Sequence, residues 1–208
     1  MLPAPKAYMI HGFLGVGKTT FAKRLEKEQA AVRFTHDEWM VRFYGNDPPA
    51  EHFQEYARRV FETMEEVWTR CLDLGINVIL DFGFWSQAER EYVQSLISRH
   101  GGKAVLYRLD CPEDVTWNWI EQRNKQAGSL YIAPATYRML RARFEPLRRD
   151  EACIDVGTHQ TPEAIAMTAS STQDHRMNGV DCANYADWRN VRFPPTFANS
   201  GPTVKSQF

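Results

Sequence analysis

The amino-acid sequence predicts an α/β fold in which helices cover both faces of a parallel sheet. Short apolar segments alternate along the chain with longer segments of helical spacing, and this alternation is typical of parallel sheets. The 208 residues are enough for one such domain and a short appendage. Strands are expected at residues 6–11, 32–35, 76–81, 103–110 and 152–156.

Helices are expected between these strands. Ser86 and Glu89 have the spacing of a capping box, which predicts a helix from there to about His100. The longest helix has a continuous apolar face and ends before Gly75, the kind of residue that usually follows a helix. This longest helix is expected at residues 50–74. The other helices are expected at residues 20–27, from His36, after Pro112, at 135–144 and from Thr161.

A glycine-rich segment follows the first strand. Residues 12–19 match G-x-x-x-x-G-K-[ST] at every fixed position, between a strand and a helix as this motif requires. Its backbone amides and the following helix N-terminus can hold phosphates, Lys18 can reach the β- and γ-phosphates, and Thr19 can ligate Mg²⁺. The predicted ATP-binding residues are Gly12, Phe13, Leu14, Gly15, Val16, Gly17, Lys18, Thr19 and Thr20.

Two other nucleotide-binding motifs do not fit the chain. A dinucleotide fingerprint needs glycine where Thr20 stands, and the segment 124–127 lacks the final Asp of the guanine-reading N-K-x-D motif. The sequence therefore predicts a P-loop NTPase three-layer sandwich with a parallel sheet and a helical lid. ATP and Mg²⁺ are the expected cofactors.

Asp37 is the predicted catalytic base. It follows the second strand, and strand ends at the carboxyl edge of a parallel sheet surround the bound ligand. A carboxylate there can take the proton of an attacking hydroxyl. The same residue could instead cap the helix that starts at His36, and the two roles are compatible.

Asp81 ends the third predicted strand, where a Walker-B-type acid would contact magnesium. Phe84 and Trp85 follow closely and are expected to line the acceptor cleft, so Asp81 could also bind the acceptor. The two roles remain open. Thr19 and Asp81 are the predicted metal residues.

A lid is expected at about residues 121–144, where two helices flank a break at Gly128. An arginine on a lid can close over phosphates and neutralise the charge that develops during transfer. Arg123 is the first choice for this catalytic role. The rivals are Arg138, Arg141 and Arg143.

Composition narrows the class of protein. The net charge of −1 argues against a protein that mainly coats nucleic acid. The four cysteines are widely spaced and form no C-x-x-C pair, which argues against a disulfide framework or a zinc site. The chain shows no secretory signal and no apolar run of membrane-spanning length. A cytoplasmic protein without membrane contact is expected.

The chain resembles the AAA_33 group of small P-loop kinases, which includes polynucleotide 5′-hydroxyl kinases and is similar to chloramphenicol phosphotransferase and the zeta toxins. The resemblance rests on the glycine loop, on Asp37 and Asp81 after their strands, on Arg123 before a lid and on residues 143–146, and it covers about residues 5–166. It implies ATP-dependent phosphorylation of a hydroxyl, with Asp37 as the base and Arg123 as the phosphate clamp.

One departure from the polynucleotide kinases concerns the acceptor. Those enzymes usually have an arginine close behind the base, whereas Glu38 and Trp39 stand there and Arg42 comes late. Glu38 would repel a polynucleotide phosphate, and Trp39 and Trp85 suit a small neutral or cationic ring-bearing molecule. The predicted acceptor-binding residues are Glu38, Trp39, Arg42, Phe84 and Trp85.

Three hypotheses follow. The first is a kinase that phosphorylates a hydroxyl of a small molecule, an antibiotic or a metabolite. The second is a polynucleotide 5′-hydroxyl or nucleotide-sugar kinase, and the third is a nucleotide-gated binding module without catalysis. The kinase domain is expected at residues 1–168, followed by a flexible tail at 169–208 that is rich in Ser, Thr, Asn and Pro. The acceptor and the oligomeric state remain open.

Overall fold

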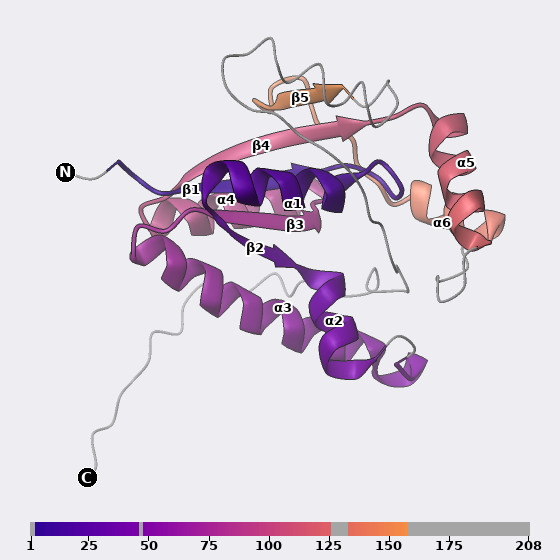
Figure 1. Ribbon diagram of the computed structural model, residues 1–208, viewed down its shortest axis with the longest axis horizontal. Helices are drawn as coiled ribbons and strands as arrows, with labels where there is room; N and C mark the ends of the chain where they lie inside the picture. Colours follow the sequence, from indigo (N-terminus) through magenta and orange to yellow (C-terminus); the bar gives the residue numbers. More distant parts are fainter. Residues whose placement is uncertain (1–2, 46–47, 126–132, 158–208) are drawn as a thin grey trace.

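The computed structural model describes residues 3–45, 48–125 and 133–157, which contain a five-stranded sheet (Figure 1). The strand order is β2-β3-β1-β4-β5, and all neighbouring strands are parallel. The predicted α/β class is therefore confirmed. The strands are β1 (Lys6–His11), β2 (Val32–Thr35), β3 (Val78–Gly83), β4 (Lys103–Asp110) and β5 (Ile154–Gly157).

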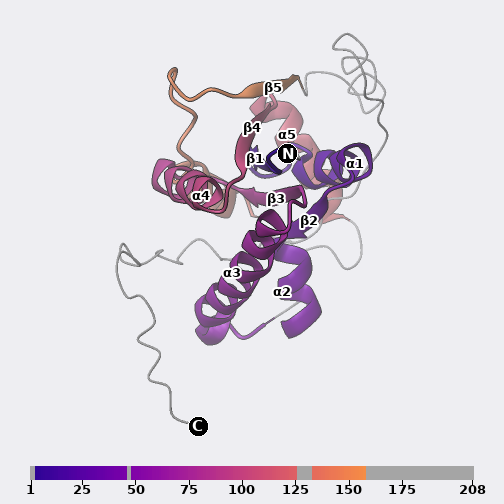
Figure 2. The same cartoon turned by 90° about the vertical axis from the view of Figure 1, so that its left-hand side faces the viewer.

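Helices cover both faces of the sheet, as Figure 2 shows: α3 and α4 lie on one face and α1 lies on the other. Each face has its own apolar core. Trp68 and Met64 of α3 are completely buried in the first core, and Ala22 of α1 is completely buried in the second. The helices are α1 (Lys18–Gln29), α2 (His36–Tyr44), α3 (Ala50–Asp73), α4 (Gln87–Arg99), α5 (Glu113–Asn124) and α6 (Pro134–Arg141).

The central strand β1 contributes to both cores. Ala7 and Met9 pack in the core beneath α3 and α4, whereas Tyr8 and Ile10 pack in the core beneath α1. Successive side chains of a strand point to opposite faces, so a strand covered on both faces must be apolar at every position. This explains why residues 7–10 form an uninterrupted apolar run and lie at the centre of the sheet.

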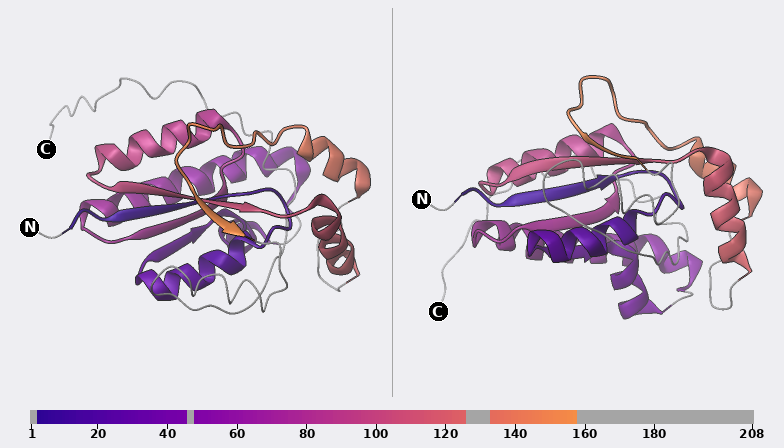
Figure 3. Two further views of the ribbon diagram at one scale, coloured as in Figure 1. Left: turned by 90° about the horizontal axis from the view of Figure 1, so that it is seen from above. Right: turned by 45° about the horizontal axis from the view of Figure 1, so that its top comes forward.

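The functional segments meet at one edge of the sheet. Because all strands are parallel, the glycine loop after β1, the start of α2 after β2 and the end of β3 share the carboxyl edge. Figure 3 shows α5 and α6 beyond the carboxyl end of β4, on this same side.

The boundaries of some elements differ from those expected. β3 begins two residues later than predicted and continues to Gly83, because the turn after Asp81 is still paired with β1. The helix expected at 135–144 ends at Arg141. The helix expected at Thr161, the boundary at 168 and the tail at 169–208 lie outside the described residues, as does the lid segment 126–132. None of the described helices has the length and apolar character needed to cross a bilayer.

The helix cap expected at Ser86 is confirmed and generates the first prediction. The Ser86 hydroxyl accepts the amide proton of Glu89 at 3.1 Å, which satisfies one of the free donors at the start of α4. We expect Ser86→Ala to lower the free energy of unfolding by about 1 kcal/mol. Denaturant melts monitored by circular dichroism measure this change.

A control for this cap lies on the same helix. Ser95 is exposed, and we expect Ser95→Ala to change the stability by no more than about 0.5 kcal/mol. Equal losses in the two variants would show that the cap does not stabilise α4.

Candidate functional site

The glycine loop has the wrapped backbone that phosphate binding requires. Gly15 and Gly17 have φ angles of 76° and 86°, a region that side chains other than glycine rarely adopt. Gly12 passes so close to β4 that a Cβ atom would lie 2.7 Å from the carbonyl oxygen of Leu109. Gly17 is also the N-cap of α1, so the positive end of this helix faces the interior of the loop.

Lys18 lies across this loop. Its side chain is buried, with 4% of the residue exposed, and its Nζ donates a hydrogen bond to the carbonyl oxygen of Phe13 at 2.8 Å. The ammonium group therefore sits over the start of the loop instead of extending into solvent. This is the position from which a lysine can contact the outer phosphates of a nucleotide.

Asp81 is a buried acid beside the loop. Burial raises the pKa of its carboxyl group, and the charge of Lys18 and the hydroxyl of Thr19 lower it. Lys18, Thr19 and Asp81 thus lie within electrostatic reach of one another. Asp81 lies more than 60 residues after Lys18 and Thr19 in the sequence, and the sheet brings them together.

The residues at this point fit a magnesium ion. The Oδ1 atom of Asp81 is buried and has no hydrogen-bond partner within the described residues, and the Thr19 hydroxyl lies nearby. A hydroxyl and a carboxylate are the hard oxygen ligands that Mg²⁺ prefers. In the described part of the chain no three or more His, Cys, Asp or Glu form a metal cage, so phosphate and water would complete the coordination.

Asp37 lies close to Asp81. Its charge is one of the causes that raise the pKa of Asp81, and its own side chain is only 15% exposed. The residue before it anchors the start of α2: His36 Nε2 donates to the carbonyl oxygen of Ala57 in α3 at 3.1 Å. Asp37 is therefore held at the carboxyl edge of the sheet, near the predicted metal residues.

Glu38 is engaged by cations of two neighbouring elements. Its carboxylate forms ion pairs with Arg33 of β2 at 3.0 Å and with Lys23 of α1 at 3.4 Å. These contacts tie α2 to the helix that follows the phosphate loop. The negative charge expected to repel a polynucleotide is thus balanced by two cations, and the structure gives Glu38 a role in positioning α2.

Trp39 and Arg42 lie further along α2. Trp39 is half-buried and packs against Phe34 and Phe43, and the Arg42 side chain is exposed. Both can face an acceptor that binds beside α2.

Phe84 and Trp85 do not line an open cleft. Phe84 is completely buried in the core beneath α3 and α4, and Trp85 is 5% exposed and packs against Phe13. The expected acceptor contact of these two rings finds no support in this burial. The sequence did not distinguish the two cases, because an aromatic pair after a strand fits a cleft wall and a core equally well.

The turn that carries these two residues supports the phosphate loop. Gly12 donates its amide proton to the carbonyl oxygen of Gly83 at 3.3 Å, and Trp85 Nε1 donates to the carbonyl oxygen of Gly12 at 3.2 Å. The first residue of the loop is therefore hydrogen-bonded on both sides by the β3–α4 turn. Trp85 therefore supports the nucleotide site through the hydrogen bond of its indole to the loop backbone.

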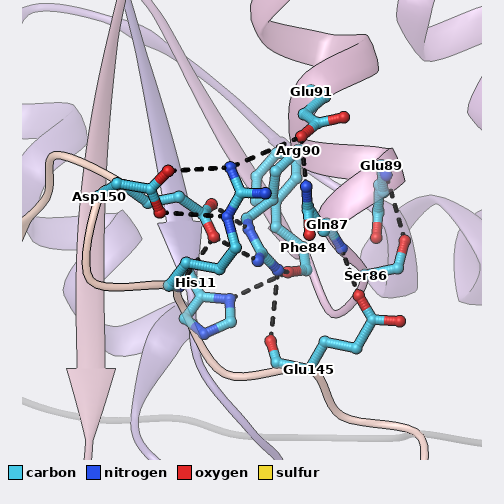
Figure 4. A network of polar contacts seen from close by, with 11 residues as sticks. His11, Phe84, Ser86, Gln87, Glu89, Arg90, Glu91, Glu145 and Asp150 are labelled. Carbon is cyan, nitrogen blue, oxygen red and sulfur yellow. Dashed lines mark hydrogen bonds and ion pairs between the residues drawn. The ribbon is translucent and has the colours of Figure 1, made fainter.

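This turn has an unusual backbone that buried donors hold in place (Figure 4). Phe84 has a φ angle of 48°, which costs roughly 1–2 kcal/mol for a residue with a side chain. Its carbonyl oxygen accepts from Arg90 at 3.1 Å and interacts with His11 Nδ1 at 2.9 Å. Because a carbonyl can only accept, His11 carries its proton on Nδ1. Burial, with the charges of Arg90 and Lys18, lowers the pKa of His11 to about 4 despite the Phe84 hydrogen bond, so its ring is neutral at pH 7.

Arg90 is fixed by an acid from the end of the described chain. Glu151 receives two hydrogen bonds from the Arg90 guanidinium, at 2.7 and 2.8 Å, while Arg90 is 1% exposed. The guanidinium also donates to the carbonyl oxygen of Glu145 at 3.3 Å. The hydrogen bond from Arg90 is the largest cause that lowers the pKa of Glu151 to about 2. Residues 145–151 are thereby attached to the start of α4, and Figure 4 shows Glu145 beside Arg90.

The lid arginines are only partly described. Arg123 lies near the end of α5, and its side chain is outside the described part of the chain. Among its rivals, Arg141 of α6 places its guanidinium 5.0 Å from the centre of the Phe13 ring, at the phosphate loop. Arg138 and Arg143 are exposed.

Two groups of residues at the site were not predicted. One is Arg33 and Thr35 of β2, which contact Asp81 directly or through each other. The other is the Arg90–Glu151 pair beneath the turn. Thr35 could have been found from its place at the end of a strand beside Asp81, whereas a pair separated by 61 residues has no signal in a single sequence.

Comparisons with known proteins agree with this architecture. The sequence profile of the family described as AAA domain (AAA_33) matches residues 8–147. A protein from Chloroflexus aurantiacus designated a candidate kinase is similar in structure, with a TM-score of 0.65, 21% identity, and coverage of 81% of this chain and 95% of that chain.

Two further solved structures are similar. A sugar kinase from Janibacter sp. has a TM-score of 0.55 and 20% identity, over 80% of this chain and 92% of that chain. A chain of the Pnkp1/Rnl/Hen1 RNA repair complex has a TM-score of 0.59 and 20% identity, over 69% of this chain and 45% of that chain. At these identities the similarity shows the shared fold. A search of curated protein sequences found no match.

The Arg90–Glu151 pair generates a prediction about stability and pH. We expect Glu151→Gln to lower the free energy of unfolding by about 2 kcal/mol at pH 7, less than a fully buried pair would lose, because water reaches Glu151. The pKa of Glu151 is depressed in the folded state, so its contribution is complete above pH 4.5 and is lost as the pH falls toward 2. The difference between wild type and variant should shrink over that window.

Thermal melts from pH 7 to pH 2 measure this difference. The control is Glu62→Gln, which breaks the exposed pair of Glu62 with Arg58 on α3 and should cost no more than about 0.5 kcal/mol. A constant difference down to pH 2, or an equal loss in both variants, would contradict the assignment.

Proposed function

Because the chain belongs to the AAA_33 family, we propose that it is an ATP-dependent kinase that transfers the γ-phosphate to a hydroxyl group of a small molecule. The observation that carries this proposal is the convergence of Lys18, Thr19, Asp81 and Asp37 at one edge of the sheet. A phosphate loop with its lysine and a metal acid suffices for nucleotide binding. A further carboxylate beside them is what a transfer reaction to a hydroxyl adds.

Each residue has a defined part in the proposed reaction. The loop amides and Lys18 hold the β- and γ-phosphates, and Mg²⁺ held by Thr19 and Asp81 would neutralise their charge. Asp37 takes the proton of the acceptor hydroxyl. The acceptor oxygen forms a bond to the γ-phosphorus while the bond from phosphorus to the β–γ bridging oxygen breaks, which releases ADP and the phosphorylated acceptor.

The choice of phosphate clamp rests on position. Arg123 remains our first candidate, because α5 stands beyond the carboxyl end of β4 (Figure 3). Arg141 is supported by its contact with Phe13 of the phosphate loop. Separate Arg123→Ala and Arg141→Ala variants distinguish them, since only the clamp should lower kcat for transfer without weakening the fold.

A small acceptor is supported by the charges that surround Asp37. Lys23 and Arg33 are paired with Glu38, and on α3 Arg58 and Arg59 are paired with Glu62 and Glu55. A polynucleotide would need several cations for its phosphates. Among the described residues of α2, Arg42 is exposed and forms no ion pair with a carboxylate, and a single cation of this kind suits a small molecule better.

A polynucleotide or nucleotide-sugar acceptor is the second candidate. It is favoured by the balanced charge of Glu38, which no longer argues against a phosphate, and by the likeness to a chain of an RNA repair complex. A screen of acceptors for stimulated ATP turnover decides between the two. It should include sugars, polyols, antibiotics with free hydroxyls, nucleotide sugars and 5′-hydroxyl oligonucleotides, the last at several salt concentrations.

The third possibility, a binding module without catalysis, makes a different prediction. It would bind ATP but leave ADP formation at the rate of the uncatalysed reaction with every acceptor. Asp37 would then be dispensable.

Lys18 tests the phosphate site. We expect Lys18→Ala to abolish transfer and to weaken ATP binding, because the outer phosphates lose the cation that lies across the loop. Calorimetry of ATP binding and an ADP-release assay measure the two effects. Lys27→Ala is the control, since this lysine is exposed at the far end of α1. Turnover at the wild-type rate in Lys18→Ala would refute the assignment.

Asp37 tests the chemistry. Asp37→Asn keeps the shape of the side chain and removes the proton acceptor, so we expect kcat for transfer to fall by roughly 10²–10⁴. The dissociation constant for ATP should hardly change, because Asp37 faces the acceptor. Asp73→Asn at the far end of α3 serves as the matched control. A loss of kcat below tenfold would place the base elsewhere, with Glu38→Gln as the next variant to measure.

A further inference from the structure

The two oxygens of Asp81 have different surroundings. Oδ2 accepts a hydrogen bond from the Thr35 hydroxyl at 3.3 Å. Oδ1 is buried and has no hydrogen-bond partner of good geometry among residues 3–45, 48–125 and 133–157, although the Thr19 hydroxyl lies close enough to the carboxyl group to lower its pKa. Buried carboxylate oxygens are rarely left unpaired, because the cost of desolvation is then not repaid. The difference indicates that one oxygen is anchored and the other is reserved for a ligand.

Thr35 is held in the orientation that anchors Oδ2. It lies directly opposite Asp81 in the register of β2 and β3. Its hydroxyl oxygen accepts a hydrogen bond from the Arg33 guanidinium. Since a hydroxyl has a single proton and arginine can only donate, the Thr35 proton must point to Asp81. The three side chains form a directed chain of hydrogen bonds from Arg33 to Thr35 to Asp81.

Arg33 is itself fixed by two helices. Its side chain is 13% exposed and forms ion pairs with Glu26 of α1 and Glu38 of α2, both at 3.0 Å. Burial alone would lower the pKa of Arg33, but the hydrogen bonds and charges of Glu38 and Glu26 raise it instead. Arg33 therefore stays charged, and each of its three guanidinium nitrogens contacts a different partner, from α1, α2 and β2.

We propose that Thr35 is a positioning residue that, oriented by Arg33, anchors Oδ2 of Asp81 and thereby directs Oδ1 to the cation bound with ATP. This rests on the proposed function, in which Asp81 and Thr19 hold magnesium. Thr35 does not touch the nucleotide in this scheme. It sets the rotation of the carboxylate, so its removal should weaken nucleotide binding only when the cation is present.

The experiment compares ATP binding by calorimetry in excess Mg²⁺ and in EDTA. Thr35→Val removes the hydroxyl and keeps the shape of the side chain. We expect it to weaken ATP binding in Mg²⁺ by about tenfold, the size of one hydrogen bond to a charged group, and to change binding in EDTA by less than about twofold. Thr35→Ser retains the hydroxyl and should restore binding in Mg²⁺ to within about threefold of wild type.

Thr69→Val is the matched control. Thr69 is buried in α3, and its hydroxyl bonds to the carbonyl oxygen of Glu65 at 2.8 Å, so the same chemical change is made away from the site. It should leave both ATP affinities unchanged. Arg33→Lys keeps the charge but loses the fork that reaches Thr35. It should show the same selective loss in Mg²⁺ and serves if Thr35→Val does not fold.

The outcomes separate the two proposals. A wild-type protein that binds ATP with equal affinity in Mg²⁺ and in EDTA would overturn the metal assignment of the proposed function, and this inference with it. A normal magnesium effect in the wild type, combined with unchanged or equally weakened binding in both buffers for Thr35→Val, would overturn the positioning role alone. A selective loss in Mg²⁺ that serine restores supports it.

Discussion

The nucleotide site depends on how the backbone of Gly12 is held. The loop must wrap around an anion, and its three glycines have no side chains with which to hold that shape. Its first residue is instead fixed from outside, by hydrogen bonds from the Trp85 indole and to the carbonyl of Gly83. A side chain at Gly12 would collide with Leu109. The shape of the loop is thus set by two neighbouring strands.

The β3–α4 turn that holds Gly12 must itself be stabilised, because its backbone is strained at Phe84. Two buried side chains, His11 and Arg90, contact the carbonyl oxygen of Phe84 and hold the turn in place. Arg90 could not remain buried without Glu151, since an unpaired buried guanidinium would cost several kcal/mol. The phosphate loop therefore depends on Glu151 through Arg90, the carbonyl of Phe84 and the β3–α4 turn. An apolar side chain at position 90 could not donate a hydrogen bond to the Phe84 carbonyl, which gives the buried Arg90–Glu151 ion pair a structural role.

The sequence predicted the parts of the fold that have a local signal. The glycine loop, β1, the Ser86 cap and the alternation of strands and helices all follow from residues close together in the chain. The burial of Trp85, the left-handed φ of Phe84 and the Arg33–Thr35–Asp81 chain could not be predicted in this way. Each results from packing between segments far apart in the chain, and a local sequence pattern does not reveal such packing.

The charges near Asp37 also limit what an acceptor can use. The Lys23–Glu38 pair has both side chains more than 40% exposed, and such pairs contribute at most about 1 kcal/mol, so an acceptor carrying a negative group could displace Glu38 from Lys23. Arg33 is different, because it is 13% exposed and bonded to Glu26, Glu38 and Thr35. An acceptor that formed an ion pair with Arg33 would break the Arg33–Thr35 hydrogen bond and disturb the orientation of Asp81. An anionic acceptor would therefore recruit Lys23 and leave Arg33 in place, which keeps acceptor recognition separate from the geometry of the metal acid.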